Sequence, residues 1–294
     1  MKYFIVVLIL ALNVSTSVLA TVNCPTGTTE NVDCWSCGVT CTAVLDQTGQ
    51  MTISGEGEMT YWMQEEDVPW HDKRANIKNI IISDQITTIG ARAFSFTDLS
   101  NVSIPDSVTY IGTMAFYNSN ISDIHFGNQL EIIDYGAFSD CSNLHVVEFP
   151  DSLNRIDSYA FAGVTLTSVD LGNGLEKIKK RAFENVIALA IPNTVTEIDP
   201  EAFKYGSLKV LYCDSSQEQQ ALCAAAIEGS GLQGQCTLKS YFKDEEGNLI
   251  VGQRKYASLE DLANGKHILK RIYTIDEANA VAKPTGNTVR IKYR

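Results

Sequence analysis

The chain has 294 residues, 45% of them hydrophobic and only 7 of them proline, so it can bury a large core and is not a disordered tract. Its net charge is −12, and residues 21–236 carry 28 Asp and Glu against 11 Lys and Arg. Such an acidic body repels phosphate backbones, which excludes nucleic acid as the expected partner.

Residues 1–20 have the layout of a cleavable secretory signal, with a basic Lys2, an apolar run over 3–12 and small residues at the end. A membrane anchor is the weaker alternative, because the apolar run is too short to cross a bilayer. We therefore expect a mature protein without a transmembrane segment, either secreted into the extracellular medium or held at the cell surface. Both locations permit disulfides.

Residues 21–76 contain four cysteines, Cys24, Cys34, Cys37 and Cys41, and are expected to form a cysteine-rich β N-terminal cap. Four cysteines allow three full pairings, which their spacing does not rank. A redox Cys34-x-x-Cys37 pair or a zinc site is the alternative, but the redox motif needs a thioredoxin-like βαβ context, which this segment lacks. We therefore expect two structural disulfides, with no metal and no cofactor.

An Ala-Phe pair recurs along the chain with a period of about 22 residues. Its phenylalanines are Phe94, Phe116, Phe138, Phe161, Phe183 and Phe203. Roughly ten residues after each Phe comes a short strand with an apolar-x-x-apolar-x-apolar pattern. The central apolar residues of these strands are Val102, Ile124, Val147, Val169, Leu189 and Leu211, with an earlier copy at Ile80. The sequence therefore predicts about seven coils over 77–213.

Each strand is followed by a turn with proline or glycine and by a second apolar pair such as Val108 and Ile111. One coil cannot bury its apolar face alone, but stacked coils bury one another. We therefore expect the seven strands to pair in parallel as one sheet, on the order of 30 Å wide. The Phe rings should stack into a spine. The coil at Phe183 is two residues short before its strand, which we interpret as a loop deletion.

This pattern resembles the BspA-type leucine-rich repeats in runs such as "ITTIGARAFSFTDLSNVSIPDSVTYIGTMAF" and "IPNTVTEIDPEAFKYGSLKVL". The resemblance implies an α/β-type repeat solenoid of leucine-rich-repeat coils with a parallel β-sheet. The preceding "CTAVLDQTGQMTISGEGEMTYW" is similar to the β-rich cap of such proteins. The family is associated with surface adhesion and with binding of ligands or host proteins, and its pattern includes no catalytic residues.

Residues that flank the inward strand positions must point out of the sheet. One outward column consists of Ile81, Ser103, His125, Glu148, Asp170, Ala190 and Tyr212. We predict that a partner binds at its bulky or charged members, His125, Glu148, Asp170 and Tyr212. A His beside carboxylates also fits a cation site or an acid–base pair, but both need a pocket. No P-loop, dinucleotide fingerprint or H-E-x-x-H motif is present, so we name no catalytic residue and no metal ligand.

Two sequons lie in the repeats, Asn101-Val-Ser and Asn120-Ile-Ser. Both are candidates for glycosylation if the source is a eukaryote. A glycan on Asn101 would cover part of the outward face, because this residue belongs to a second outward column beside the first.

The other four cysteines lie in and after the repeats. Cys141 follows an Ala-Phe turn at a position that should be buried, so we expect a free core thiol. Cys223 and Cys236 are expected to form a disulfide, which leaves Cys213 at the end of the last strand.

Residues 214–236 are expected to form a helical C-terminal cap. Ser215 and Glu218 make a capping-box pattern, and a helix over 219–228 would stop at Gly229. Such a helix would cover the apolar layer at the open end of the solenoid.

Residues 237–294 differ from the body, with 11 Lys and Arg against 7 Asp and Glu. Short strand patterns and one short helix pattern predict a small basic α+β module. It is either an attachment device or a second cap packed on the first, and the sequence does not rank these two alternatives.

Together these observations favour an extracellular binding or adhesion protein whose solenoid surface recognises a protein or glycan partner. The first alternative is a structural wall or matrix component held by its C-terminal module. The second is a secreted enzyme with its site in that module, which has the least support because the module contains one His and no catalytic motif. We therefore predict a protein that is not an enzyme.

Overall fold

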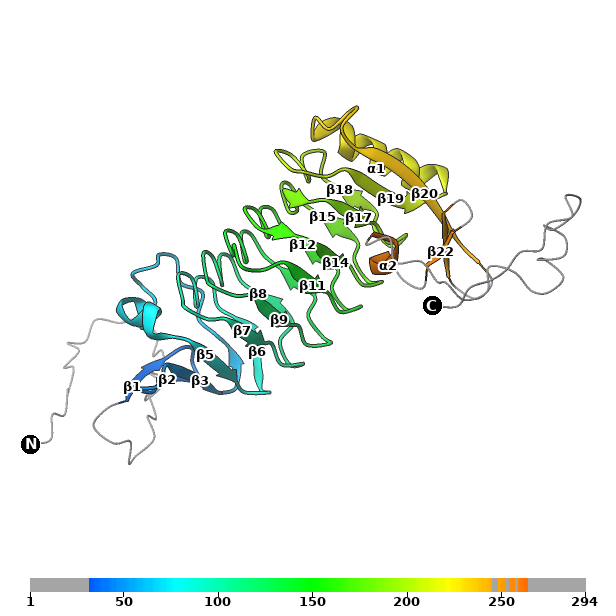
Figure 1. The fold of residues 1–294 in the computed structure, drawn as a ribbon. Coiled ribbons are helices and arrows are strands. Elements are labelled where there is room, and N and C mark those ends of the chain that lie inside the picture. The colour runs from blue at the N-terminus through cyan, green and yellow to red at the C-terminus, as the bar shows by residue number, and fades with distance from the viewer. Residues whose placement is uncertain (1–31, 245–247, 252–253, 257–258, 264–294) are drawn as a thin grey trace, which may run out of the picture.

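The structure, a computed structural model, describes residues 32–244, 248–251, 254–256 and 259–263. The expected signal peptide and Cys24 lie outside these residues. Figure 1 shows the coils stacked one on the next from the N-terminal strands to α1 at the other end. Within the described residues, no helix is long and apolar enough to span a membrane.

The N-terminal cap is a small antiparallel sheet of β1 (Asp33–Ser36), β2 (Cys41–Leu45) and β3 (Gln50–Gly55). Alternate residues of β2 and β3 are buried, as the two-residue period of a strand requires. β3 also pairs in parallel with β5 (Asn79–Ile82), the first strand of the repeats. The predicted β-rich cap is confirmed, and it continues directly into the first coil.

The second apolar pair of each coil forms a continuous sheet of seven strands, six of which come from the coils. Its strands are β4 (Gly57–Glu58), β6 (Ile86–Ile89), β8 (Tyr110–Ile111), β10 (Ile132–Ile133), β12 (Arg155–Ile156), β15 (Lys177–Ile178) and β18 (Glu197–Ile198). Neighbouring strands are parallel, with Ile111 opposite Ile133 and Ile133 opposite Ile156.

The strands with the apolar-x-x-apolar-x-apolar pattern lie on another face of the solenoid. They are β7 (Asn101–Ser103), β9 (Asp123–His125), β11 (Val146–Glu148), β14 (Ser168–Asp170), β17 (Ala188–Ala190) and β19 (Val210–Asp214). They are parallel and in the predicted register, but β7 pairs with β9, β11 with β14 and β17 with β19. The prediction of one seven-stranded sheet from this pattern is wrong. The spacing of apolar residues predicts which side chains point inward. It does not predict whether the backbones of neighbouring coils align well enough to form a continuous ladder of hydrogen bonds. Two shorter strands, β13 (Thr165–Leu166) and β16 (Asn185–Val186), pair with each other beside this face.

The predicted phenylalanine spine is confirmed. Phe116, Phe138 and Phe161 are fully buried, and successive ring centroids lie 5.2 and 5.3 Å apart in nearly parallel planes. The same stack continues to Phe94 on one side and to Phe183 on the other. The backbone also links these turns, because the N–H of each spine Phe in this stretch donates to the carbonyl of the Ala in the next coil.

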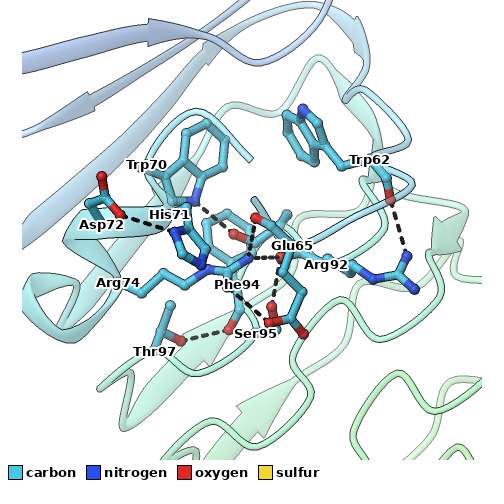
Figure 2. A network of polar contacts seen from close by, with 11 residues as sticks. Trp62, Glu65, Trp70, His71, Asp72, Arg74, Arg92, Phe94, Ser95 and Thr97 are labelled. Carbon is cyan, nitrogen blue, oxygen red and sulfur yellow. Dashed lines mark hydrogen bonds and ion pairs between the residues drawn. The ribbon is translucent and has the colours of Figure 1, made fainter. Parts of the chain in front are cut away.

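Trp70 of the N-terminal cap makes the contacts that a preceding coil would make with the first Ala-Phe turn. Trp70, just before the 3-10 helix η1 (His71–Asn76), donates its indole N–H to the Ala93 carbonyl at 2.7 Å (Figure 2). Within the repeats, this carbonyl position accepts from a Phe N–H of the preceding coil. The Trp70 ring also stacks on Phe94 with centroids 6.1 Å apart, so one side chain closes both the spine and the hydrogen-bond row.

An ion pair between buried Arg74 and half-buried Glu65 lies at the same junction (Figure 2). Arg74 is 5% exposed, and its Nη1 lies 3.4 Å from Glu65 Oε2. Its Nη2 donates to the Glu65 carbonyl at 3.2 Å and to the Arg92 carbonyl at 3.5 Å. Burial lowers the Arg74 pKa, and the neighbouring Glu65 opposes that effect. The Arg74 guanidinium thus joins the cap loop at Glu65 to the first Ala-Phe turn at Arg92.

The C-terminal helix α1 (Gln217–Gly229) forms where the sequence predicts a helical cap. Its N-cap is Ser216, whose side chain accepts from Gln219 N, so the expectation of Ser215 is wrong by one residue. Asp214 Oδ1 accepts from Ser216 N at 2.9 Å, and this turn places Ser216 at the cap position.

At the last coil, as at the first, a side chain takes the place of a backbone hydrogen-bond partner. The N–H of Phe203 has no further coil to meet and donates instead to Ser230 Oγ at 3.1 Å. Ser230 Oγ in turn donates to the Pro200 carbonyl at 3.0 Å. On α1, Gln219 Nε2 donates to the Val195 carbonyl at 2.6 Å. The helix therefore satisfies polar groups that the next coil would otherwise bond.

Cys213 forms a disulfide with Cys223, with their Cα atoms 6.7 Å apart. The expected Cys223–Cys236 bond is therefore wrong, and Cys236 is a free, half-buried thiol. The reason is that the two cysteines lie at different ends of the last strands. Cys213 lies near the end of β19, next to α1. Cys236 precedes the strand that pairs with the start of β19, where Thr237 N donates to the Lys209 carbonyl at 2.7 Å.

The described part of 237–294 packs on the solenoid, which was one of the two expectations for this segment. β20 (Thr237–Lys243) pairs in parallel with β19 and extends its sheet by one strand. β21 (Leu249–Val251) and β22 (Arg254–Tyr256) follow as antiparallel neighbours, and α2 (Leu259–Ala263) contacts β14, β17 and β19.

Candidate functional site

The outward positions of β7, β9, β11 and β14 form a surface that we call the strand face. Its inward residues, such as Val147, are buried, and their neighbours point outward, as the strand period predicts. Figure 1 shows β7, β9, β11 and β14 in succession along one face of the solenoid.

Three of the four predicted partner-binding residues lie on the strand face. His125 and Glu148 are exposed, and Asp170 is half-buried. Glu148 is directly opposite Asp170 in the β11–β14 pair, and β9, which carries His125, is in contact with β11. The structure therefore brings these three residues together on successive strands.

Local contacts orient the charged groups of the strand face. His125 Nδ1 lies 3.9 Å from Asp123 Oδ2 on the same strand, with both side chains mostly exposed. Asp170 Oδ1 accepts the N–H of Gly172 at 3.0 Å, which holds this carboxylate at the edge of the face. The face therefore presents carboxylate oxygens from neighbouring strands toward solvent.

Tyr212 does not belong to the accessible surface, and its prediction as a partner-binding residue is wrong. It is 8% exposed, because it packs with Tyr241, Leu249 and Leu262 in a small apolar cluster. Lys239 Nζ lies 5.6 Å from the centroid of its ring. The cause is not local: β20 to β22 and α2 fold over the outward positions of β17 and β19.

The covering contact is itself well packed. Tyr241 is 1% exposed, and its hydroxyl donates to the Ile191 carbonyl at 2.8 Å. Burial raises the Tyr241 pKa, so this hydroxyl stays protonated and keeps its role as a donor. The strand face is thus open from β7 to β11, is contacted by α2 at β14, and is covered by the C-terminal segment at β17 and β19.

A shallow, open depression at the N-terminal end extends the strand face beyond the predicted residues. Its lining consists of Gln50, Asn79, Ile80, Asn101, Val102, Ser103 and His125. Sequence analysis missed Gln50, which comes from the cap and lies opposite Asn79 across the β3–β5 pair. The amide and hydroxyl groups offer both donors and acceptors beside the acidic part of the face.

The two glycosylation candidates are both exposed. Asn101 lies at the depression, where its Nδ2 donates to Ser100 Oγ at 3.2 Å. Asn120 lies after the next Ala-Phe turn, and its Nδ2 donates to Asp98 Oδ1. Glycosylation of either one remains a prediction.

The cysteines of the cap form structural bonds. Cys37 and Cys41 form a disulfide with Cα atoms 5.0 Å apart, and Cys34 is also disulfide-bonded. Cys34 and Cys37 are therefore not bonded to each other, which removes the basis of the redox alternative. Among the described residues, no group of three or more His, Cys, Asp or Glu side chains has an arrangement that would hold a metal ion.

The free cysteine of the repeats agrees with expectation. Cys141 is buried, its Sγ donates to the Phe116 carbonyl at 3.1 Å, and burial raises the pKa of its thiol to about 11. Ser119 Oγ lies 3.3 Å from the same sulfur. The thiol thus links two coils through hydrogen bonds and is a poor nucleophile at neutral pH.

Comparison with solved structures finds leucine-rich repeat proteins of bacteria. A leucine-rich repeat protein from Bacteroides ovatus ATCC 8483 is 23% identical with a TM-score of 0.43, and the match covers 50% of this chain and 40% of that protein. A leucine rich cell surface protein from Faecalibacterium prausnitzii A2-165 is 19% identical with a TM-score of 0.44, and the match covers 74% and 60% of the two chains. The chain thus spans less than two thirds of either protein. None of the curated proteins matches it.

Comparison with protein families gives a match in the repeats. The profile of the BspA type leucine rich repeat region matches residues 71–190 in 6 copies. The matched residues include five of the six Ala-Phe turns and the strands from β5 to β17. Residues 71–190 are therefore a BspA-type leucine-rich repeat region, and proteins with such repeats are generally surface or adhesion proteins.

Proposed function

We propose that the chain is an extracellular binding or adhesion protein that holds a partner protein on the strand face. The observation that carries this proposal is the charge of the face. Asp123, Glu148 and Asp170 project from three successive strands. No outward residue of β7, β9, β11 or β14 is Lys or Arg. The complementary surface is therefore one that supplies cations and hydrogen-bond donors.

The shape of the strand face favours a macromolecule over a small metabolite. Small-molecule sites are concave and enclose most of their ligand. The depression beside His125 is shallow and open, and the remaining outward residues lie on strands of three residues. A rigid surface of this kind gives contact area with little ordering of the protein on binding. The proposal is of a binding protein and not of an enzyme.

The test is a double substitution, Glu148→Gln with Asp170→Asn. Both changes keep an acceptor oxygen, so the contact of residue 170 with Gly172 N is retained and thermal stability should stay close to that of the parent. Attachment to surface proteins extracted from the source cells should weaken by about threefold to tenfold, mainly through a slower on-rate with a smaller salt dependence. Surface plasmon resonance over a salt series measures both quantities.

The matched control removes the same charge from another face of the solenoid. Glu131 and Glu176 are exposed next to strands of the seven-stranded sheet, and Glu131→Gln with Glu176→Gln should leave attachment unchanged. Equal attachment by the parent and the Glu148/Asp170 variant would contradict the proposal.

A structural wall or matrix component is the second candidate, and it depends on the C-terminal segment. Removal of 264–294 tests it, because this variant keeps the whole described part of the chain, including β20 to α2. If this truncation abolishes attachment while the Glu148/Asp170 variant attaches normally, the basic C-terminal segment is the functional part. In both cases residues 1–20 are proposed to act as a signal peptide for export.

A further inference from the structure

The strand face lies in the part of the solenoid where acidic residues are not balanced by basic ones. Residues 93–154, which include β7, β9 and β11, contain eight Asp and Glu and no Lys or Arg. Asp106 and Asp151, in the turns after β7 and β11, are exposed and extend the acidic surface beyond the strands. Their Oδ1 atoms accept the N–H groups of Asn128 and Asn173 at 2.7 Å, which holds both carboxylates in these turns. The negative charge of the strand face therefore continues from coil to coil.

The positive charge of the chain is concentrated in residues 264–294, which we call the basic segment. It contains 7 Lys and Arg against 2 Asp and Glu, whereas residues 237–263 contain 4 against 5. Its first cations are Lys266, Lys270 and Arg271, in the run "KHILKRIY" that also supplies apolar side chains. The charge of the basic segment is thus opposite to that of the strand face.

The basic segment starts at the edge of the strand face. It follows Ala263, the last residue of α2, and α2 contacts β14, the last strand of the strand face. Leu262 of α2 is fully buried in the cluster that covers Tyr212, so the end of this helix is held on the solenoid. The start of the basic segment is therefore fixed beside the carboxylates.

The distances from this starting point are short. Neighbouring strands lie about 4.8 Å apart, so β14 and β7 are separated by about 15 Å. The eight residues 264–271 span at most about 26 Å when extended. The first three cations of the basic segment can therefore reach every carboxylate between β14 and β7.

We propose that the basic segment lies on the strand face of its own chain, with its first cations beside Asp123, Glu148 and Asp170, and that a partner has to displace it. Each exposed ion pair of this kind is weak. The covalent link through α2 compensates for this weakness, because a short linker gives the basic segment an effective concentration in the millimolar range. Val146 on β11 is 49% exposed and offers apolar surface to the run that carries these cations.

The same arithmetic favours the chain's own segment over that of a second copy. At micromolar protein, the basic segment of another molecule is present at about a thousandth of the effective concentration of the linked one. The displacement of the basic segment by a partner rests on the proposed function of the strand face. Its contact with the carboxylates does not, and it is tested without any partner.

The first test is carboxylate labelling with a carbodiimide and glycine ethyl ester at low salt, measured by mass spectrometry. Removal of 264–294 should speed the labelling of Asp123 and Glu148 by about threefold, because the basic segment no longer covers them. Exposed Glu131 and Glu176 are internal controls on another face and should be labelled equally in both chains. An increase from about 10 mM to 1 M salt shortens the Debye length from about 30 to 3 Å and should remove the difference.

Two variants of the full chain separate the first cations from the rest of the basic segment. Lys266→Gln, Lys270→Gln and Arg271→Gln together should speed the labelling of Glu148 nearly as much as the truncation does. The matched control removes three charges farther from α2, with exchanges to Gln at Arg290, Lys292 and Arg294. It should have a smaller effect, because the effective concentration falls as the linker lengthens.

The second test uses the carbodiimide alone, which joins a lysine amine to a carboxylate only where the two groups meet. In the full chain, Lys266 or Lys270 should become linked to Asp123, Glu148 or Asp170. An equal mixture of unlabelled and ¹⁵N-labelled protein identifies the source of the lysine. The linked peptides should be entirely light or entirely heavy, and mixed peptides would show the basic segment of a second copy and overturn the proposal.

The failure of this proposal is distinguishable from failure of the proposed function. Equal labelling of Glu148 in the full and the truncated chain at low salt, with equal rates at Glu131 and Glu176, would overturn the contact. Cross-links of Lys266 and Lys270 to carboxylates outside the strand face alone would also overturn it. Neither result depends on attachment to surface proteins, which tests the proposed function separately. If the contact is present, removal of 264–294 should instead speed that attachment.

Discussion

Phe138 shows how much a single side chain contributes to this fold. It is fully buried, with Phe116 at 5.2 Å on one side and Phe161 at 5.3 Å on the other. The ring of Phe126 meets it edge-on at 5.8 Å. Its removal leaves a hole between two stacked rings that belong to different coils, and the backbone bonds between coils prevent those rings from closing the gap.

We therefore expect Phe138→Ala to lower the free energy of unfolding by roughly 3 to 5 kcal/mol, as large truncations in packed cores do. Denaturant unfolding followed by circular dichroism measures this loss. Phe138→Leu keeps much of the volume and is the matched control, with a clearly smaller expected loss. A loss below about 1 kcal/mol for Phe138→Ala would contradict the spine as the main source of stability.

At the scale of elements, the sequence predicts what is local or repeated. The period of about 22 residues predicts the Phe spine, the inward Val102 and Ile124, and the register of the paired strands. These features are predictable because apolar residues recur at the same positions in every coil. The seven-stranded sheet of the second apolar pairs was not predicted, because a ladder depends on the backbone alignment of neighbouring coils. The burial of Tyr212 was not predicted, because it depends on contacts with the later segment from β20 to α2. Of the candidate site, His125, Glu148 and Asp170 were placed correctly together.

The disulfide at the C-terminal end differs from the sequence prediction in the cysteine that pairs with Cys223. It joins Cys213 of β19 to Cys223 of α1 and leaves Cys236 half-buried as a free thiol. The pattern of buried residues along β19 and α1 does not identify disulfide partners, because the distance between two cysteines depends on how α1 lies on the last coil.

Alkylation followed by mass spectrometry tests this assignment. Without reductant, a peptide that links Cys213 to Cys223 should be found, and Cys236 should be the first thiol to react. Cys141 should react only after unfolding, because it is buried and its pKa is raised to about 11. A Cys223–Cys236 peptide, or rapid labelling of Cys141 in the native protein, would contradict the structure.

For the whole molecule, the two ends of the solenoid matter most. A repeat array leaves hydrogen-bonding groups and apolar surface exposed at its first and last coils. Here a side chain replaces a missing backbone group at each end: the Trp70 indole N–H bonds the Ala93 carbonyl, and Ser230 Oγ accepts the Phe203 N–H. The spine ends under Trp70 in the same way.

Trp70→Phe and Ser230→Ala should each lower the free energy of unfolding by about 1 to 3 kcal/mol, because each leaves one buried backbone group without a partner. Thermal and denaturant unfolding measure the effect. The control for the first is Trp62→Phe, since that indole packs on Trp70 at 5.2 Å and donates no hydrogen bond in the described structure. The control for the second is Ser142→Ala, at an exposed serine. Equal stability of each variant and its control would show that the hydrogen bonds of Trp70 and Ser230 contribute nothing to the free energy of unfolding.

The side-chain hydrogen bonds at the two ends have a consequence for how the number of repeats can change in evolution. Because Trp70 and Ser230 bond only the first and the last coil, and α2 reaches no coil before that of β14, a duplication of one 22-residue unit between β7 and β11 would meet neighbours of its own kind on both sides. Neither Trp70 nor Ser230 would lose its partner. In that stretch the protein is thus able to grow or shrink by whole units while its ends stay the same, and each added unit would lengthen the strand face by one strand.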